Sequence, residues 1–155
     1  MTTVDTDYWK DADKRKTWDD LVAGETRPSL PYELTLEAIQ RYCRSVGDNN
    51  PLYFDEEYAR KSRWGGLIAP PYIHTLLLLA CTPMTDMMRT PGTINASQFW
   101  SYNLPARPGD IITLEARALD KFIKGDRLFA VHDNVFYNQK REVICAGRGW
   151  TVRPA

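Results

Sequence analysis

The pattern of hydrophobic and polar positions divides the chain into a helical first half and a second half of strands. Between residues 35 and 81, apolar side chains recur at helical spacing. After Pro91-Gly92 they alternate with polar side chains, which is the period of a strand. Helices followed by a run of long strands predict an α+β fold with an antiparallel sheet.

The first predicted helix begins after Thr35, whose side chain suits an N-cap, and ends where Gly47 interrupts the pattern. Its apolar positions are Leu36, Ile39, Tyr42, Cys43 and Val46. A second, short helix is predicted over residues 55–60, because acidic side chains open it and basic ones close it.

The third predicted helix runs from about residue 72 to residue 81. Pro70 and Pro71 precede it, and proline is well placed in a first helical turn. The segment is apolar nearly all round apart from His74 and Thr75, and helices of that kind are buried.

Four strands are predicted at residues 93–104, 111–122, 128–137 and 142–152. In the second strand the apolar positions that alternate with polar ones are Ile112, Leu114, Ala116 and Ala118. In the third strand one face carries Phe129, Val131, Val135 and Tyr137. Alternation of this kind puts successive side chains on opposite faces of a sheet.

Residues 1–17 are strongly charged and form a separate N-terminal arm ahead of a domain over residues 18–155. The arm is either disordered, or its aromatic Tyr8 and Trp9 anchor a short helix on a partner subunit. It has no apolar central segment, so it is not a signal peptide.

Composition narrows the class of protein. A chain of 155 residues with 43% hydrophobic and 26% charged residues is one ordinary globular domain. Twenty basic and twenty acidic residues cancel, so nothing favours nucleic acid or a membrane surface as a partner. The apolar run 73–81 is too short to span a membrane.

The three cysteines, Cys43, Cys81 and Cys145, are odd in number, far apart and set in apolar surroundings. We interpret them as buried reduced thiols, which favours a cytoplasmic protein. Their spacing is not that of metal ligands, and no metal or cofactor is expected.

The candidate chemistry lies in one loop, Gly47-Asp48-Asn49-Asn50-Pro51-Leu52. Pro51 fixes its own φ angle and keeps Asn50 out of helical space, so Asp48 lies on a stiff loop between two helices. Its carboxylate either serves a functional site or only forms an Asx turn.

This loop resembles the hydratase signature of MaoC-like dehydratases and (R)-specific enoyl-CoA hydratases. In that signature Gly-Asp-x-Asn-Pro is followed by an aliphatic residue, here Leu52, and then by a catalytic histidine, whose place Tyr53 takes. The resemblance covers about residues 18–153. It implies a single hot-dog fold, in which an antiparallel sheet wraps around a long central apolar helix, and at least a dimer.

The resemblance also implies what the site would need. In the family, the aspartate and histidine act on one water while a backbone N–H at the start of the central helix supports the thioester oxygen. Asp48 is retained, but Tyr53, with an ordinary pKa of about 10, is a poor base near neutrality. Pro70 and Pro71 occupy the helix start and have no N–H.

Three hypotheses follow. In the first, the chain is the degenerate half of an enoyl-thioester hydratase or 3-hydroxyacyl-thioester dehydratase of fatty acid metabolism. Its substrate would be an acyl-CoA or acyl-carrier-protein thioester, and it would dimerise with itself or with a paralogous hot-dog subunit. In the second, it is a self-sufficient hydratase that uses Asp48 with Tyr53 or His74. In the third, it is a non-catalytic acyl-CoA binding protein.

The remaining candidate residues each have a structural alternative. The substrate-binding candidates are Asn50, Trp64, Pro71, Tyr72 and Trp100. Phe99 and Tyr102 are further candidates for the acyl pocket, although aromatic residues on strands commonly belong to the core.

His74 is either a core or interface histidine or a substitute acid or base, whereas His132 is expected in the core. Arg107 and Lys121 either meet coenzyme A phosphates or lie on the solvated surface.

Overall fold

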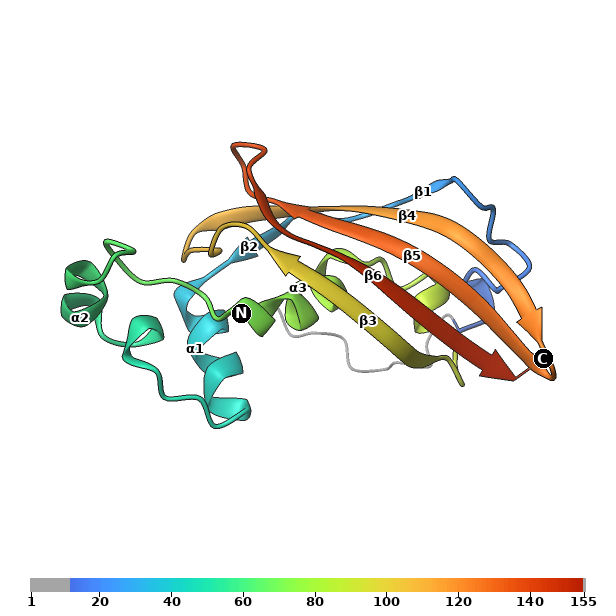
Figure 1. Cartoon of the computed structure of the whole chain (residues 1–155), viewed down its shortest axis with the longest axis horizontal. Coiled ribbons are helices and arrows are strands. Elements are labelled where there is room, and N and C mark those ends of the chain that lie inside the picture. Colours follow the sequence, from blue (N-terminus) through green and yellow to red (C-terminus); the bar gives the residue numbers. More distant parts are fainter. Residues whose placement is uncertain (1–11, 155) are drawn as a thin grey trace.

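A single antiparallel sheet curves around one short helix (Figure 1). The computed structural model describes residues 12–154. The strands in that range are β1 (Thr26–Arg27), β2 (Tyr32–Leu34), β3 (Ile94–Tyr102), β4 (Asp110–Lys124), β5 (Arg127–Tyr137) and β6 (Val143–Pro154). Their order is β1-β4-β5-β6-β3, and β2 also pairs with β4.

The four long strands lie where the alternation predicts them, within two residues at each end. Two strands were missed, because β1 and β2 are only two and three residues long and lie beside prolines. Both pair with β4, through the registers Thr26↔Arg117 and Tyr32↔Ile112. They extend the sheet on the side opposite to β3.

The two helices before the apolar segment are both capped at their N-termini, the first by Thr35 as predicted and the second by Asp55, for which no cap was predicted. In α1 (Leu36–Ser45) the Thr35 hydroxyl accepts a hydrogen bond from the Ala38 N–H at 3.1 Å. Gly47 follows this helix with a φ of +75°, a conformation that glycine adopts without strain. In α2 (Glu56–Lys61) the carboxylate of Asp55 accepts from the Tyr58 N–H at 2.9 Å.

The central helix is shorter than the sequence suggests. A 3-10 turn, Pro71–Ile73, precedes the regular helix α3 (His74–Cys81), which has eight residues. Consecutive prolines remove two N–H donors at this point, and the first bond of the turn instead joins the Ile73 N–H to the Pro70 carbonyl. The buried residues of α3 are His74, Leu77, Leu78 and Cys81.

The inner face of the sheet, which packs on α3, contains small residues and polar residues. On β4 the predicted apolar positions are buried, as expected. On β5, however, the face aligned with them carries Ala130, His132, Asn134 and Phe136. The large apolar group Phe129, Val131, Val135 and Tyr137 therefore lies on the opposite face. The strand's alternation alone did not identify the inner side.

A polar layer lies inside the far half of the sheet. The guanidinium of Arg27 and the carboxylate of Asp86 form a buried ion pair at 3.0 Å. His132, which is 1% exposed, has its Nε2 at 3.3 Å from the Thr151 hydroxyl. Burial, assisted by the nearby charge of Arg27, lowers the pKa of His132 to about 3. This histidine is a neutral core residue, as predicted.

Residues 12–20 pack against this end of the molecule. The Lys16 N–H donates to the Thr85 carbonyl at 2.9 Å, and the Trp18 indole N–H donates to the Phe129 carbonyl at 2.8 Å. The candidate anchors Tyr8 and Trp9 lie outside the described residues. The three cysteines are free and buried. Within residues 12–154, no helix combines the length and apolar character needed to cross a membrane.

Replacing Asp86 with asparagine tests the buried ion pair. The change leaves the Arg27 cation in the core without a counterion, so we expect a loss of about 3–5 kcal/mol in the free energy of unfolding, measured with urea. Glu56→Gln is the control, because it breaks the Arg60–Glu56 pair, whose side chains are 66% and 70% exposed, and should leave stability unchanged within error. Equal effects of the two variants would contradict the assignment.

Acid sensitivity tests the state of His132. The unfolded chain takes up this proton near the ordinary pKa of about 6.5, whereas the folded chain takes it up only near pH 3. Stability from this residue is therefore complete above pH 6.5 and declines as the pH falls towards 3. We expect the free energy of unfolding of His132→Gln to fall less steeply between pH 6.5 and 4.5 than that of the parent, by up to about 1.4 kcal/mol per pH unit. Parallel pH profiles would refute this.

Candidate active site

The loop after α1 holds Asp48 in an Asx turn. The Asp48 N–H donates to the Cys43 carbonyl at 2.9 Å, which continues the end of the helix. The Oδ1 atom of Asp48 accepts from the Asn50 N–H at 2.9 Å, and the Asn50 side chain in turn accepts from the Leu52 N–H at 3.1 Å. The carboxylate therefore has the structural role that the sequence allowed for it.

The second carboxylate oxygen of Asp48 has a partner as well. The Tyr72 hydroxyl donates a hydrogen bond to Oδ2. Tyr72 belongs to the 3-10 turn at the head of α3, so this bond connects the motif loop to the central helix. Burial, followed by the bond to Asp48, raises the pKa of Tyr72, so its hydroxyl stays protonated and continues to donate.

Tyr53, which stands at the histidine position of the signature, is 6% exposed. Burial raises the pKa of Tyr53, and the charge of Asp48 raises it further. Cys43 lies in the same cluster, and burial likewise raises the pKa of its thiol. Neither group is an anion near neutral pH, so neither can take a proton from water.

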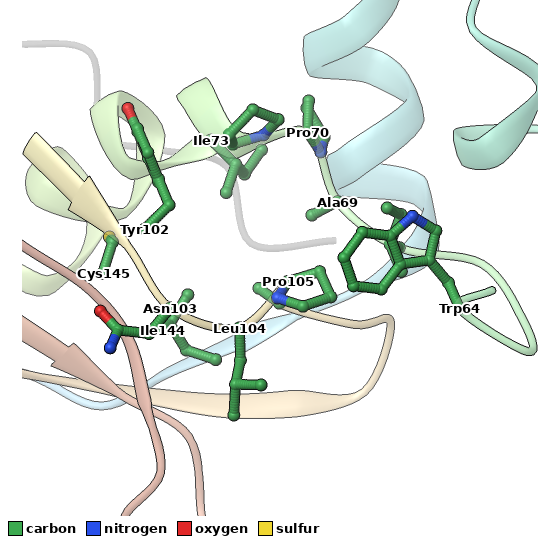
Figure 2. A pocket seen from close by; sticks show the side chains of 13 residues that line it. Trp64, Ala69, Pro70, Ile73, Tyr102, Asn103, Leu104, Pro105, Ile144 and Cys145 are labelled. Carbon is green, nitrogen blue, oxygen red and sulfur yellow. The ribbon is translucent and has the colours of Figure 1, made fainter.

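An apolar pocket of about 230 Å³ lies beside this cluster, at the head of α3. Its walls come from the segment 64–73, from the end of β3 and the residues that follow it (102–106), and from Ile144 and Cys145 of β6. Figure 2 shows Trp64 at one end and Tyr102 with Cys145 at the other. Segments that are far apart in the sequence thus form one apolar cavity.

Two arginines hold the Trp64 end of the pocket. The Arg107 guanidinium donates to the Trp64 carbonyl at 2.6 Å, and the Arg63 guanidinium lies 4.3 Å from the centre of the indole ring. Lys121, the other candidate for phosphate contact, does not line the pocket. Its ammonium donates hydrogen bonds to the carbonyls of Trp18 and Asp19 at 3.4 and 3.1 Å.

His74 occupies a layer behind the other end of the pocket. Its ring centre lies 4.2 Å from that of Trp100, and its Nδ1 atom lies 3.2 Å from the Pro71 carbonyl and 3.1 Å from the Tyr102 hydroxyl. Burial lowers the pKa of His74, and the Pro71 carbonyl opposes this in part. The imidazole is therefore neutral at neutral pH.

The predicted site residues fall into three adjoining groups. The first is the cluster Asp48, Asn50, Tyr53 and Tyr72, the second comprises Trp64 and Pro71 in the pocket wall, and the third is the stacked pair His74 and Trp100. The turn Pro71–Ile73 links the groups. Among residues 12–154, no hydrogen bond joins His74 to Asp48.

Some pocket residues carried no signal in the sequence. Leu104, Pro105 and Ile144 lie in the pocket wall only because the end of β3 and the start of β6 meet the segment 64–73. Tyr102 lines the pocket, as predicted. Phe99 does not, since its side chain is 65% exposed.

Comparison with known proteins agrees with this geometry. The family described as "FAS1-like, dehydratase domain region" matches residues 20–146. A UPF0336 protein of Streptomyces avermitilis is 30% identical over 128 residues, which cover 77% of this chain and 83% of that protein.

Two solved structures show the same fold. The MaoC-like dehydratase from Rhodospirillum rubrum superposes with a TM-score of 0.74 at 26% identity, covering 90% of this chain and 97% of the other. The HadBC complex, a (3R)-hydroxyacyl-ACP dehydratase from Mycobacterium tuberculosis, superposes with a TM-score of 0.70 at 18% identity, covering 85% and 97%. The chain therefore belongs to the FAS1-like dehydratase-region family, within the MaoC-like dehydratases and hydratases of the hot-dog fold.

Proposed function

We propose that this chain is the acyl-binding subunit of a hot-dog 3-hydroxyacyl-thioester dehydratase or enoyl-thioester hydratase, whose partner subunit carries out the chemistry. One observation carries the proposal. Both oxygens of the motif carboxylate, Asp48, already accept hydrogen bonds, from the Asn50 N–H and from the Tyr72 hydroxyl. The carboxylate is a structural element of the loop, and each of its two oxygens is already engaged by a group of the loop or of the turn.

The groups around Asp48 do not supply the missing chemistry. Hydration of an unsaturated thioester needs a base for the water, an acid for the α-carbon and donors for the enolate oxygen. Tyr53 is a buried phenol with a raised pKa, and is therefore no base. Pro70 and Pro71 lack the N–H that would support the oxygen.

The pocket beside the cluster suits an acyl chain. Its lining is mostly hydrocarbon, and hydrocarbon chains gain free energy on leaving water for such surroundings. Trp64 and Pro71 form parts of its wall. Tyr72 and Asn50 do not line the pocket, but their hydrogen bonds order the adjoining turn and loop. The thioester of an acyl-CoA or acyl carrier protein would deliver the chain.

The β3 edge supports a paired assembly. This nine-residue strand pairs with β6 alone among the described strands, and all its residues but Trp100 are exposed. An exposed edge of that length is a template for pairing with another strand. Tyr102, at the end of β3, also lines the pocket, so a subunit paired there would stand beside the acyl chain.

We propose a paralogous hot-dog subunit with an intact aspartate–histidine pair as the partner on this edge, rather than a second copy of this chain. The structural relative HadBC is itself a complex. We place the assembly in fatty acid metabolism and, because the three buried thiols are free, in the cytoplasm.

Activity measurements on the chain alone and on its complex test whether this chain only binds the acyl group while the partner subunit carries out the chemistry. We expect the isolated chain to hydrate crotonyl-CoA no faster than buffer, and the complex with a paralogue that retains Gly-Asp-x-Asn-Pro-x-His to be active. Asp48→Asn in this chain should change the rate of the complex less than about twofold. The equivalent change in the paralogue should cost at least about a hundredfold, since it removes a general base.

The opposite result would support the self-sufficient hydratase. In that case the isolated chain turns over crotonyl-CoA, and both Asp48→Asn and His74→Ala abolish the turnover. Circular dichroism of each variant separates loss of chemistry from loss of fold.

A further inference from the structure

We propose that Trp100 sets the length of acyl chain that this subunit accepts, by closing the inner end of the pocket. This inference rests on the proposed function, because it assigns a specificity role within the same acyl site. It follows from the register of β3 and β6 and from the missing side chain of Gly147.

The register puts Trp100 directly behind the pocket. Tyr102 and Cys145 are partners across β3 and β6, and both line the end of the cavity away from Trp64, where Cys145 is buried (Figure 2). Trp100 and Gly147 are partners two positions further along the same face. Successive side chains on one face of a strand follow each other at this spacing, so the indole is the next group beyond the pocket wall.

Gly147 makes room for the indole. A Cβ atom at this position would lie 2.3 Å from the Cε3 atom of Trp100 and 2.4 Å from its Cδ2 atom, which no side chain can tolerate. The ring therefore lies flat on the backbone of β6. Any other residue at position 147 would push the indole away from this position.

Neighbouring groups hold the indole in place. The His74 ring packs 4.2 Å from it between centres, and the Phe136 ring stacks at 6.0 Å. The indole N–H donates to the Gln98 side chain at 2.8 Å. Since His74 also contacts Tyr102 through Nδ1, the wall and the closing group form one packed unit.

Small and short side chains continue the inner face beyond Trp100. These are Ala116, Ala118, Asn134 and Gly149. Asn134 is 2% exposed, and its Oδ1 atom has no hydrogen-bond partner among the described residues. Removing the indole would thus extend the pocket over Ala116, Asn134 and Gly147, as far as the buried side chain of His132 in the next row.

The volume of the pocket sets the longest acyl chain that we expect it to hold. A cavity of about 150 Å³ holds one benzene ring, so the present cavity of about 230 Å³ suits an acyl chain of about six to eight carbons. Each further methylene that enters an apolar site strengthens binding about fourfold, whereas one that stays outside adds nothing. Affinity should therefore rise with chain length and then stop rising at about eight carbons.

The test is calorimetric binding of S-acyl pantetheines with saturated chains of four to twelve carbons to the full-length chain. Pantetheine is the arm common to coenzyme A and acyl carrier protein, so it serves both. For the parent, we expect the affinity to level off at about eight carbons. For Trp100→Ala, we expect it to keep rising, with the twelve-carbon thioester bound at least about tenfold more tightly than the eight-carbon one. The control is Phe99→Ala, which truncates the exposed neighbour on the opposite face and should leave the parent's profile intact.

The measurements distinguish failure of the proposed function from failure of the role given to Trp100. A parent that binds no thioester of any length overturns the proposed function itself. A parent that binds with a plateau, together with a Trp100→Ala variant that keeps the same plateau, overturns only the role of Trp100. If Trp100→Ala does not fold by circular dichroism, Trp100→Phe replaces it. Its smaller ring should move the plateau by about two carbons, and an unmoved plateau would again overturn the inference.

Discussion

The hydrogen bond from the Tyr72 hydroxyl to the Asp48 carboxylate joins the two segments on which the candidate site depends. It connects the loop after α1 to the turn that opens α3, over 24 residues of sequence. A carboxylate acceptor makes such a bond stronger than one between neutral groups. The same bond that orders the loop also occupies an oxygen that a catalytic carboxylate would offer to water.

The prolines at the head of α3 also shape the candidate site. Without their N–H groups the helix begins with a 3-10 turn, and the Pro71 carbonyl is free to meet His74 instead. The imidazole also contacts Tyr102 and Trp100. A subunit that only binds the acyl chain does not need an oxyanion donor at this place. Binding that is equal in the ground state and the transition state lowers KM without requiring one.

The inner face of the sheet shows how a small domain makes room for a ligand beside its own core. Alanine and glycine on β4 and β6 let α3 and the Trp100 indole approach the sheet closely. At the far end, the buried ion pair Arg27–Asp86 and the neutral His132 fill the space under the strands. At the near end, the Trp64–Arg107 contact ties one end of the pocket wall to the segment after β3.

The sequence by itself determined the local structure and the departure from the hydratase signature at Tyr53. Helix caps such as Thr35, the alternation along the four long strands, and the replacement of a histidine by Tyr53 are all properties of neighbouring residues. Short-range periodicity therefore sufficed to predict them, and the motif identified the family. Only the tertiary structure decided which face of β5 is inside, that Tyr72 bonds to Asp48, and that Trp100 lies on Gly147. The Tyr72–Asp48 bond depends on how the turn before α3 meets the loop after α1. The inner face of β5 and the Trp100–Gly147 contact depend on the register between strands. A shift of one residue would exchange the two faces, and no pattern within a single strand records that register.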